Sequence, residues 1–172
     1  MSTITTARLS LVPWRDEHLV DLMVLASDER VVRLIGDGKP WNRDYATDRH
    51  RAVLAHWRRH GYGWRAVLDR KTGIFSGVGS MVRHGVGEIE LGWWIAPAAW
   101  GRGLATEVAG ALRDDAFKQH GARLVVAQHQ DGNDASGRVM AKIGLVHDRS
   151  VLDDAQGGRL LHVYVGGPDS AA

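Results

Sequence analysis

Two glycines spaced two residues apart, just after an apolar stretch, are the first feature of this chain with chemical meaning. The segment Glu88–Thr106 predicts a strand that ends near Pro97, a tight turn with Gly101 and Gly103, and a helix directly after it. The first-turn amides of a helix have no partner within the helix and carry the positive end of its dipole. Because glycine has no side chain to obstruct them, such amides can bind a phosphate. The segment is a candidate site for a diphosphate-bearing ligand, with a plain connecting turn as the alternative.

Two common nucleotide-binding motifs do not match this segment. A nucleoside-triphosphate loop needs Gly-x4-Gly-Lys-Ser/Thr, and the chain contains no such run. The dinucleotide fingerprint Gly-x-Gly-x-x-Gly/Ala would end at Thr106, which breaks it. That motif also needs an acidic residue about 20 residues further on, and Arg123–Ala127 offers none. The diphosphate is therefore not expected to belong to either nucleotide class.

The histidines and cysteines limit the remaining chemistry. Among nine histidines, His56 and His60 have the i, i+4 spacing of a zinc pair on a predicted helix. No His-Glu-x-x-His arrangement accompanies them, so the sequence predicts no metal site. The chain has no cysteine, which excludes a disulfide framework, thiolate metal ligands and a cysteine nucleophile.

Composition predicts an ordinary globular protein. A length of 172 residues fits a single domain, 1–172, and 44% hydrophobic with 24% charged residues are typical globular values. A net charge of +2 is too small to indicate a nucleic-acid partner. No signal-like or membrane-spanning apolar run is present, so we expect a cytoplasmic protein without a membrane partner. The seven tryptophans are either core residues or the walls of a pocket.

The elements that must position the glycine turn follow from apolar periodicity. Leu104, Val108 and Leu112 repeat at helical spacing after the turn, and Gly121 marks the end of that helix. The strand after this helix should lie parallel to the strand before it, because a helix connects them. The pattern predicts an α/β fold with a mixed sheet and helices on both faces. Its strands are expected at 7–13, 63–69, 74–82, 88–95, 124–130, 145–152 and 159–165, and its helices at 16–26, from Asn42 or Asp44 to Gly61, 105–119 and 135–143.

In four segments the chain resembles the GNAT superfamily of acetyl-CoA-dependent N-acetyltransferases. Trp100–Ala105 matches the family motif Gln/Arg-x-x-Gly-x-Gly/Ala except at its first position, and Trp100–Glu107 looks like the ribosomal-protein N-terminal acetyltransferase branch. Asn133-x-x-Ser136, followed by Val139 and Gly144-Leu145, is similar to a second motif of that branch. Residues 7–11 and 61–67 resemble its first two strands. The likeness covers nearly the whole chain in the right order.

This resemblance implies a fold and a cofactor site. The fold would be a central, mostly antiparallel sheet of about seven strands with a splayed parallel pair, and about four helices on both faces. Acetyl-CoA would be the co-substrate: backbone groups of Trp94 and Ile95 would pair with its pantetheine arm. Asn133 would contact that arm or hold the central strands apart, with a helix cap as the alternative role. The pyrophosphate would be held by the amides of Arg102, Gly103, Leu104, Ala105 and Thr106.

The resemblance also implies catalytic roles. Glu90 matches an acidic residue on the strand before the turn and is the candidate general base, acting directly or through water. Glu88 is the substitute, since it points to the same face, and a solvated strand residue is the alternative reading of either one. Met140 stands where many members have an acidic tyrosine, so Ser136 is the candidate donor to the thiolate, or else a local helix cap. A main-chain N–H near Trp94 would stabilise the oxyanion.

The implied reaction is direct acetyl transfer, in a ternary complex, to a primary amine. The acceptor could be a protein N-terminus, or a small molecule such as a polyamine, an amino acid or an antibiotic. Its walls would come from the first two helices and the final hairpin, around Arg33, Asp37, Trp41 and Tyr45. A non-catalytic acyl-CoA sensor is the alternative function. A homodimer is common in the branch.

Overall fold

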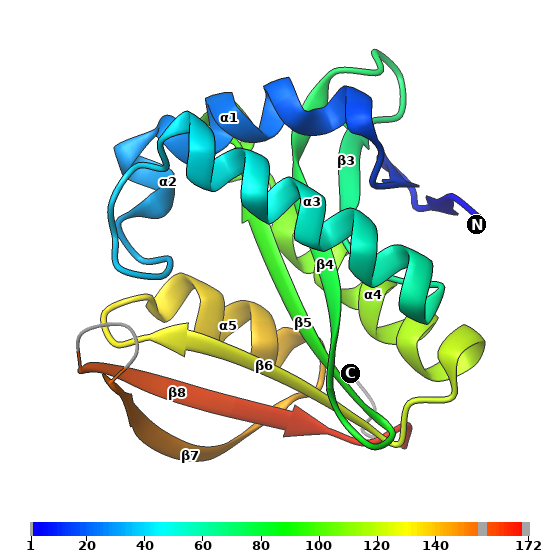
Figure 1. Cartoon of the computed structure of the whole chain (residues 1–172). Coiled ribbons are helices and arrows are strands. Elements are labelled where there is room, and N and C mark those ends of the chain that lie inside the picture. The colour runs from blue at the N-terminus through cyan, green and yellow to red at the C-terminus, as the bar shows by residue number, and fades with distance from the viewer. Residues whose placement is uncertain (1, 155–157, 170–172) are drawn as a thin grey trace.

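Within the residues that the structure describes, eight strands form one mixed sheet in the spatial order β1-β2-β3-β4-β5-β6-β8-β7 (Figure 1). The computed structural model describes residues 2–154 and 158–169. Neighbouring strands are antiparallel except β5 and β6, which run parallel because a helix connects them. The strands are β1 Ile4–Thr5, β2 Leu9–Pro13, β3 Arg65–Asp69, β4 Phe75–Gly85, β5 Glu88–Ile95, β6 Leu124–Gln130, β7 Val146–Asp153 and β8 Arg159–Gly166.

Helices cover both faces of this sheet. On the face toward the viewer in Figure 1 lie α1, α2 and α3, whereas α4 and α5 lie on the other face. Their bounds are α1 Leu19–Ser27, α2 Glu29–Val32, α3 Arg43–His60, α4 Leu104–His120 and α5 Asp134–Lys142. Short 3-10 turns precede α1 and α4, at Asp16–His18 and Pro97–Ala99. The predicted mixed fold, mostly antiparallel with one parallel pair, is confirmed.

The two long helices begin and end at the predicted signals. Asn42 caps α3: its Oδ1 accepts a hydrogen bond from the amide of Tyr45 at 2.8 Å. Gly61 ends that helix in the left-handed conformation, at φ 73°. Gly121 ends α4 in the same way, at φ 60°. Local sequence therefore sets the length of both helices.

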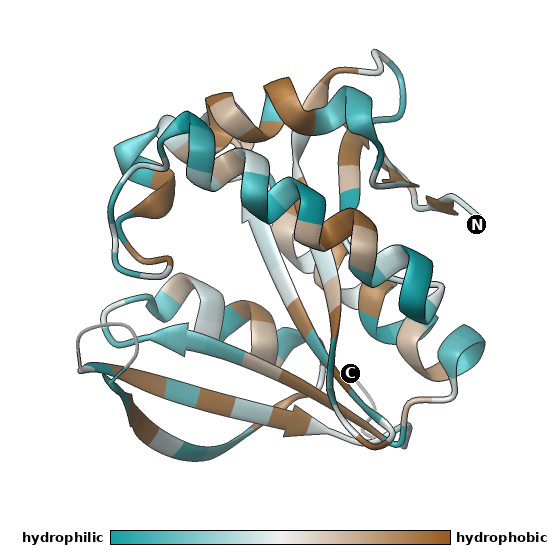
Figure 2. Cartoon of the chain, in the orientation of Figure 1, coloured by the Kyte–Doolittle hydropathy of each residue, from teal (hydrophilic) through white to brown (hydrophobic). Residues whose placement is uncertain are grey.

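The core consists of two apolar clusters, one on each face of the sheet. One packs alternate residues of β2 to β6 against α4 and α5. The other packs the opposite residues of the strands against α1, α2 and α3, and includes Trp14, Trp57 and Trp64. In Figure 2, much of the surface that α3 turns toward the viewer is hydrophilic, as expected for a helix with one buried face.

The sheet forks between its two parallel strands. Pairing of β5 with β6 runs from Glu88↔Leu124 only as far as Leu91↔Ala127. Beyond that point β5 stays with β4 up to Gly77↔Ile95, and β6 stays with β8 up to Gln130↔Leu161. The two strands diverge toward their carboxyl ends (Figure 1). This opening is the splayed pair that the family resemblance implied.

Three features were not predicted. The two-residue β1 and the four-residue α2 are too short for a periodic signal, and β4 continues to Gly85. The final hairpin is confirmed as β7 and β8, although residues 155–157 of its connection lie outside the described residues. No helix in the described part of the chain is long and apolar enough to cross a membrane.

Candidate active site

The alternation of β5 decides which backbone groups face the fork. In a strand, successive residues direct their N–H and C=O groups to opposite neighbours. The carbonyl of Gly87 accepts from the amide of Arg123 at 2.8 Å, toward β6, whereas the amide of Ala96 donates to Ser76 at 2.9 Å, toward β4. The odd-numbered residues therefore point to β6. Beyond Leu91 no β6 partner remains, so the backbone groups of Trp93 and Ile95 face the opening.

The backbones of Trp94 and Ile95, both predicted to pair with the ligand, face opposite sides of β5. The Ile95 backbone faces the fork as predicted, and its carbonyl accepts a hydrogen bond from Trp100 Nε1 at 2.6 Å. The Trp94 backbone points to β4: a Cβ on Gly77 would lie 2.1 Å from the Trp94 carbonyl oxygen. Trp93 therefore suits strand-like pairing with a ligand better than Trp94 does. Trp94 nevertheless lines the cavity at the fork.

A cavity of about 550 Å³ opens where the fork meets α4 and α5. Gly101 of the turn lines it together with eight residues of the predicted site: Trp94, Ile95, Gly103, Leu104, Ala105, Thr106, Asn133 and Ser136. Its described lining includes the cations Arg30, Arg33, Arg138 and Lys142 and no acidic residue. A cleft lined by charges of one sign concentrates ligands of the opposite charge. The cavity therefore suits an anionic ligand.

The glycine turn leaves the N-terminus of α4 without a capping side chain. Gly101 and Gly103 have φ of 72° and 73°, in the left-handed region that side chains rarely adopt. Gly103 is the N-cap of α4, where no side chain caps the helix amides. A Cβ on Gly101 would meet nothing within 4 Å, and one on Gly103 only Arg8 Nη2 at 3.8 Å. The unpaired amides of this helix end thus lie beside open space, as a phosphate site requires.

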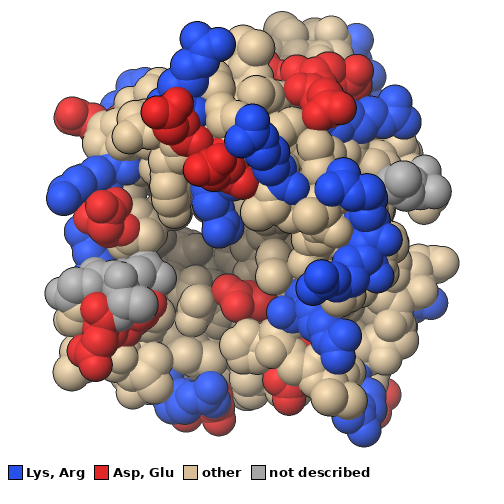
Figure 3. Space-filling model, viewed as in Figure 1, with Lys and Arg blue, Asp and Glu red and all other residues tan. Residues whose placement is uncertain are grey.

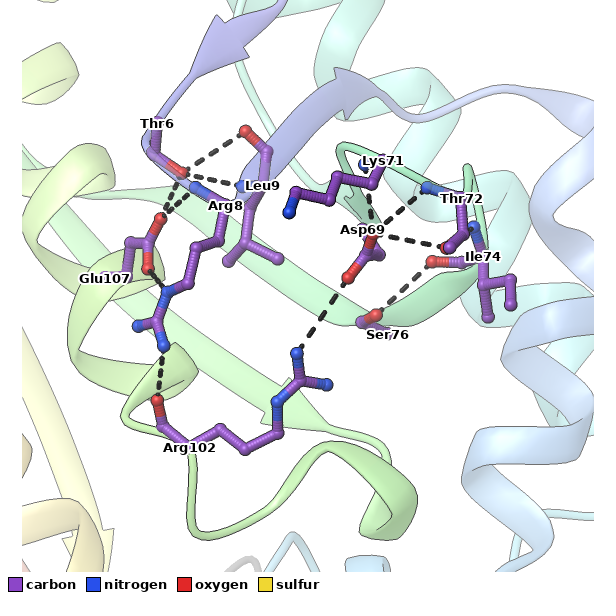
Figure 4. A network of polar contacts seen from close by, with 10 residues as sticks. All are labelled: Thr6, Arg8, Leu9, Asp69, Lys71, Thr72, Ile74, Ser76, Arg102 and Glu107. Carbon is purple, nitrogen blue, oxygen red and sulfur yellow. Dashed lines mark hydrogen bonds and ion pairs between the residues drawn. The ribbon is translucent and has the colours of Figure 1, made fainter.

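A polar network braces this turn from the start of the chain (Figure 4). The Glu107 carboxylate accepts hydrogen bonds from Thr6 Oγ1 at 2.6 Å, the Arg8 amide at 2.8 Å and Arg8 Nε at 2.6 Å. Arg8 Nη1 also donates to the carbonyl of Arg102 at 2.7 Å. The Arg102 side chain points away toward Asp69 Oδ2, 4.0 Å distant, so only its backbone belongs to the predicted site. The sequence did not predict these contacts, although Glu107 is the last residue of the Trp100–Glu107 motif.

Glu107 should make stability depend on pH. Burial alone would raise its pKa, but the hydrogen bonds from Thr6 and Arg8 and the charge of Arg8 outweigh burial and hold the pKa below its ordinary value of 4.5. A carboxylate with a depressed folded pKa stabilises the fold above its unfolded pKa, and that contribution is lost as pH falls through the folded value. We expect Glu107→Gln to lower the free energy of unfolding by about 2 kcal/mol near neutral pH.

The same variant should lose part of the acid dependence below pH 4.5. Urea unfolding over a pH series measures both effects. Glu29→Gln, at an exposed position in the first turn of α2, is the control. A Glu107→Gln protein whose stability follows the wild-type curve throughout would contradict this role.

Asn133 and Ser136 lie together at the start of α5. Asn133 Oδ1 accepts from the amide of Ser136 at 3.3 Å, so Asn133 is the helix cap named as its alternative role. Both residues also line the cavity, which leaves the ligand role compatible with capping. Met140 is 1% exposed and packs in the core next to α4.

Glu90 lies at the point of the fork, on the face covered by α1, α2 and α3. Its pair Glu90↔Val126 is next to the last rung of the parallel ladder. Gln128 Nε2 donates to Glu90 Oε1 at 3.3 Å across the fork, and His84 Nδ1 lies 3.3 Å from Oε2. Its side chain is 31% exposed and is not part of the cavity lining. Glu88 lies two residues further back, where the strands are still paired.

His56 and His60 serve the structure. Their rings are 4.5 Å apart, and His56 Nδ1 contacts the carbonyl of Tyr62 at 2.9 Å. Burial lowers the pKa of His56, opposed in part by that hydrogen bond. Among the described residues no group of histidines and carboxylates could hold a metal ion.

The fold and the site together define the class of protein. A mixed sheet forks between its only parallel pair in the described residues, and a glycine turn at a helix head lies beside the fork. Residues 8–146 match the family model described as the acetyltransferase (GNAT) domain. The chain belongs to that family.

Individual relatives agree with this assignment. The chain is 29% identical over 169 residues to the FsC-acetyl coenzyme A-N(2)-transacetylase of Aspergillus fumigatus. This match covers 84% of this chain and 65% of the relative. It is 34% identical over 97 residues to the protein YkkB of Bacillus subtilis, over 53% of this chain and 56% of the relative. The chain thus spans less than two thirds of the length of these curated relatives.

Solved structures share the fold over nearly all of the chain. An acetyltransferase of Agrobacterium tumefaciens superposes with a TM-score of 0.80 at 27% identity, covering 95% of this chain and 94% of that one. RimL, a ribosomal alpha-N-protein acetyltransferase in complex with coenzyme A, superposes with a TM-score of 0.84 at 14% identity, covering 98% and 99%. At that identity the second likeness concerns the fold alone.

Proposed function

We propose that this protein is an acetyl-CoA-dependent N-acetyltransferase that transfers acetyl directly to a primary amine. The observation that carries the proposal is the uncovered head of α4 beside the forked strands, in a cavity lined by cations. The name of the Aspergillus relative states acetyl transfer to a nitrogen, which agrees with this chemistry. Family membership supports the same reaction class.

The residues present fit acetyl-CoA. The amides of Arg102, Gly103, Leu104, Ala105 and Thr106, at the turn and the first turn of α4, would bind the pyrophosphate in the open space above the glycines. The backbone groups of Ile95 and Trp93 would pair with the pantetheine amides, as a neighbouring strand would. Asn133 would contact the same arm from the start of α5. Acetyl-CoA supplies an activated acyl group on a thiol that leaves readily.

The chain's own residues would move the two protons of the reaction. An amine must lose a proton to attack a carbonyl, and Glu90 at the fork would accept it directly or through water. The oxyanion that forms would be stabilised by a main-chain N–H of the open edge near Trp94. Ser136 Oγ would donate a proton to the departing thiolate and regain one from solvent. No covalent enzyme intermediate is required.

Binding can be tested before chemistry. A ligand that binds the native state alone raises the melting temperature. We expect acetyl-CoA and free CoA to stabilise the protein in a heat scan, and NAD to have no effect. A melting temperature that neither CoA compound raises at millimolar concentration would contradict the proposal. Stabilisation without CoA release for any amine would instead favour an acyl-CoA sensor.

Ser136→Ala is expected to lower kcat about tenfold, less than a typical general-acid loss. The reason is that a thiol, with a pKa near 8.5, leaves as a thiolate without much help. The α5 cap uses the Ser136 amide rather than its hydroxyl, so the fold should be unaffected. Steady-state CoA release measures the effect, and Ser136→Thr should retain more activity than Ser136→Ala. An unchanged kcat in Ser136→Ala would remove Ser136 from the reaction.

A further inference from the structure

Three aromatic rings form a wall on the sheet face that carries Glu90. Trp41 contacts Tyr45 with ring centroids 4.9 Å apart and Trp94 with centroids 5.0 Å apart, in both cases edge to face. Trp94 in turn contacts the buried Trp64 at 5.6 Å, which anchors the wall in the core. Tyr45 is 49% exposed at the other end. Such edge-to-face packing makes a rigid apolar surface.

Between this wall and Glu90, the only β5 residue on the same face is Gly92, which has no side chain. Glu90, Gly92 and Trp94 alternate onto the same face of β5. A Cβ on Gly92 would meet only Ser80 Oγ, at 2.7 Å, and no other atom within 4 Å. Its φ is not positive, so the backbone conformation does not require glycine there. Four strand residues separate the α-carbons of Glu90 and Trp94 by roughly 13 Å.

A set of hydrogen bonds joins the loop before Trp41 to the other side of the fork. Arg159 of β8 donates to the Asp37 carbonyl at 2.7 Å and to Gln130 Oε1 at 2.5 Å. Gln130, which is buried on β6, donates to the Gly36 carbonyl at 2.6 Å. The segment between α2 and Trp41 is thereby tied across the fork to the β6–β8 side. Figure 3 shows the molecule hollowed between this segment and that side of the sheet.

We propose that the acceptor is a monoamine whose nitrogen is joined by a short aliphatic chain to a flat apolar ring. This proposal rests on the proposed function and specifies its acceptor. The amine would lie at the Glu90 carboxylate and the ring against Trp41 and Trp94, a spacing that the roughly 13 Å between the α-carbons of Glu90 and Trp94 allows. Before it loses its proton, the ammonium is attracted by the Glu90 carboxylate.

The same features argue against two other acceptor classes, a polyamine and a free amino acid. A polyamine would need several carboxylates in line, whereas Glu90 is followed on this face by a glycine and a tryptophan. A free amino acid would bring its carboxylate close to that of Glu90, which would repel it, and the cations at the fork line a cavity of which Glu90 is not part.

A matched pair of amines tests the wall directly. We expect kcat/KM for 2-phenylethylamine to exceed that for ethylamine at least tenfold, because the ring alone is buried against the wall. Spermidine, glycine and a peptide with a free N-terminal alanine should be poorer than 2-phenylethylamine. If any of these three is preferred, or if the two matched amines are equal, the assignment of the acceptor is overturned.

Substitutions of Trp41 and Tyr45 test whether the ring of the acceptor binds at this wall. Tyr45→Ala and Trp41→Ala should each raise KM for 2-phenylethylamine about tenfold, and Trp41→Phe should restore most of the loss. KM for acetyl-CoA and for ethylamine should not change. Arg58→Ala, exposed on the same helix about 20 Å from Tyr45, is the control. Equal KM changes for both amines would mean that the wall is purely structural and would overturn the proposal.

Failure of the proposed function would look different. In that case no amine would release CoA and acetyl-CoA would not raise the melting temperature, and the acceptor assignment would fall with it. A protein that binds acetyl-CoA and acetylates spermidine or the peptide best would keep its proposed function and lose only this assignment.

Discussion

Replacing Glu90 by glutamine is expected to lower kcat about 10²- to 10³-fold, the ordinary loss for a positioned general base. Glutamine keeps the size of the side chain and can still contact Gln128, but it cannot accept a proton. CoA release at saturating acetyl-CoA and amine measures the effect. The melting temperature and its increase with acetyl-CoA should match those of the wild type, since Glu90 is not part of the cavity lining.

Glu88→Gln is the matched control. It removes the same charge two residues earlier on the same face, where β5 and β6 are still paired. The defect of Glu90→Gln should also shrink as pH approaches about 10, because the amine then loses its proton in solution. Equal activity of wild type and Glu90→Gln, or a larger loss in Glu88→Gln, would assign the base elsewhere.

Gly103→Ala is expected to weaken acetyl-CoA binding about ten- to hundredfold. The left-handed φ of 73° is strained for alanine, and the new methyl group occupies the space above the head of α4. Losing one amide hydrogen bond to a charged group costs about 1.5–3 kcal/mol. Calorimetric titration with free CoA measures the affinity without any contribution from chemistry.

The opposite end of the same helix supplies the control for this variant. Gly121 ends α4 at φ 60°, with nothing within 4 Å of a Cβ. Gly121→Ala therefore introduces similar backbone strain far from the glycine turn. It should lower the melting temperature comparably and leave CoA affinity unchanged. Equal affinity losses in both variants would show that strain, and not obstruction of an anion site, explains the effect.

Local sequence signals predicted most elements of the fold. The helix α4, found at Leu104–His120, was predicted at 105–119 from Leu104, Val108, Leu112 and the glycine after it, because a 3.6-residue period and a left-handed cap are local properties. The parallel pairing of β5 with β6 followed from the connecting helix. The strand β1 and helix α2 escaped prediction because two and four residues contain no period.

The site was less accessible to sequence reasoning. Which of Trp93, Trp94 and Ile95 faces the fork depends on the phase of the strand, which is set by hydrogen bonds of Gly87 and Ala96 with other elements. The bracing of the turn by Arg8 joins residues 99 positions apart in the chain. Trp41 and Trp94 were only candidate pocket walls until the fold brought their rings together.

The most direct test of the central claim is a single-turnover reaction with acetyl-CoA labelled in its acetyl group. Excess enzyme is mixed with labelled acetyl-CoA and 2-phenylethylamine, quenched at intervals, and both the protein and the small molecules are analysed by mass spectrometry. We expect the label to pass to the amine nitrogen at the rate of CoA release, with none on the protein, and Glu90→Gln to slow this step. Label that remains on acetyl-CoA with every amine, or that passes first to a protein side chain, would contradict it.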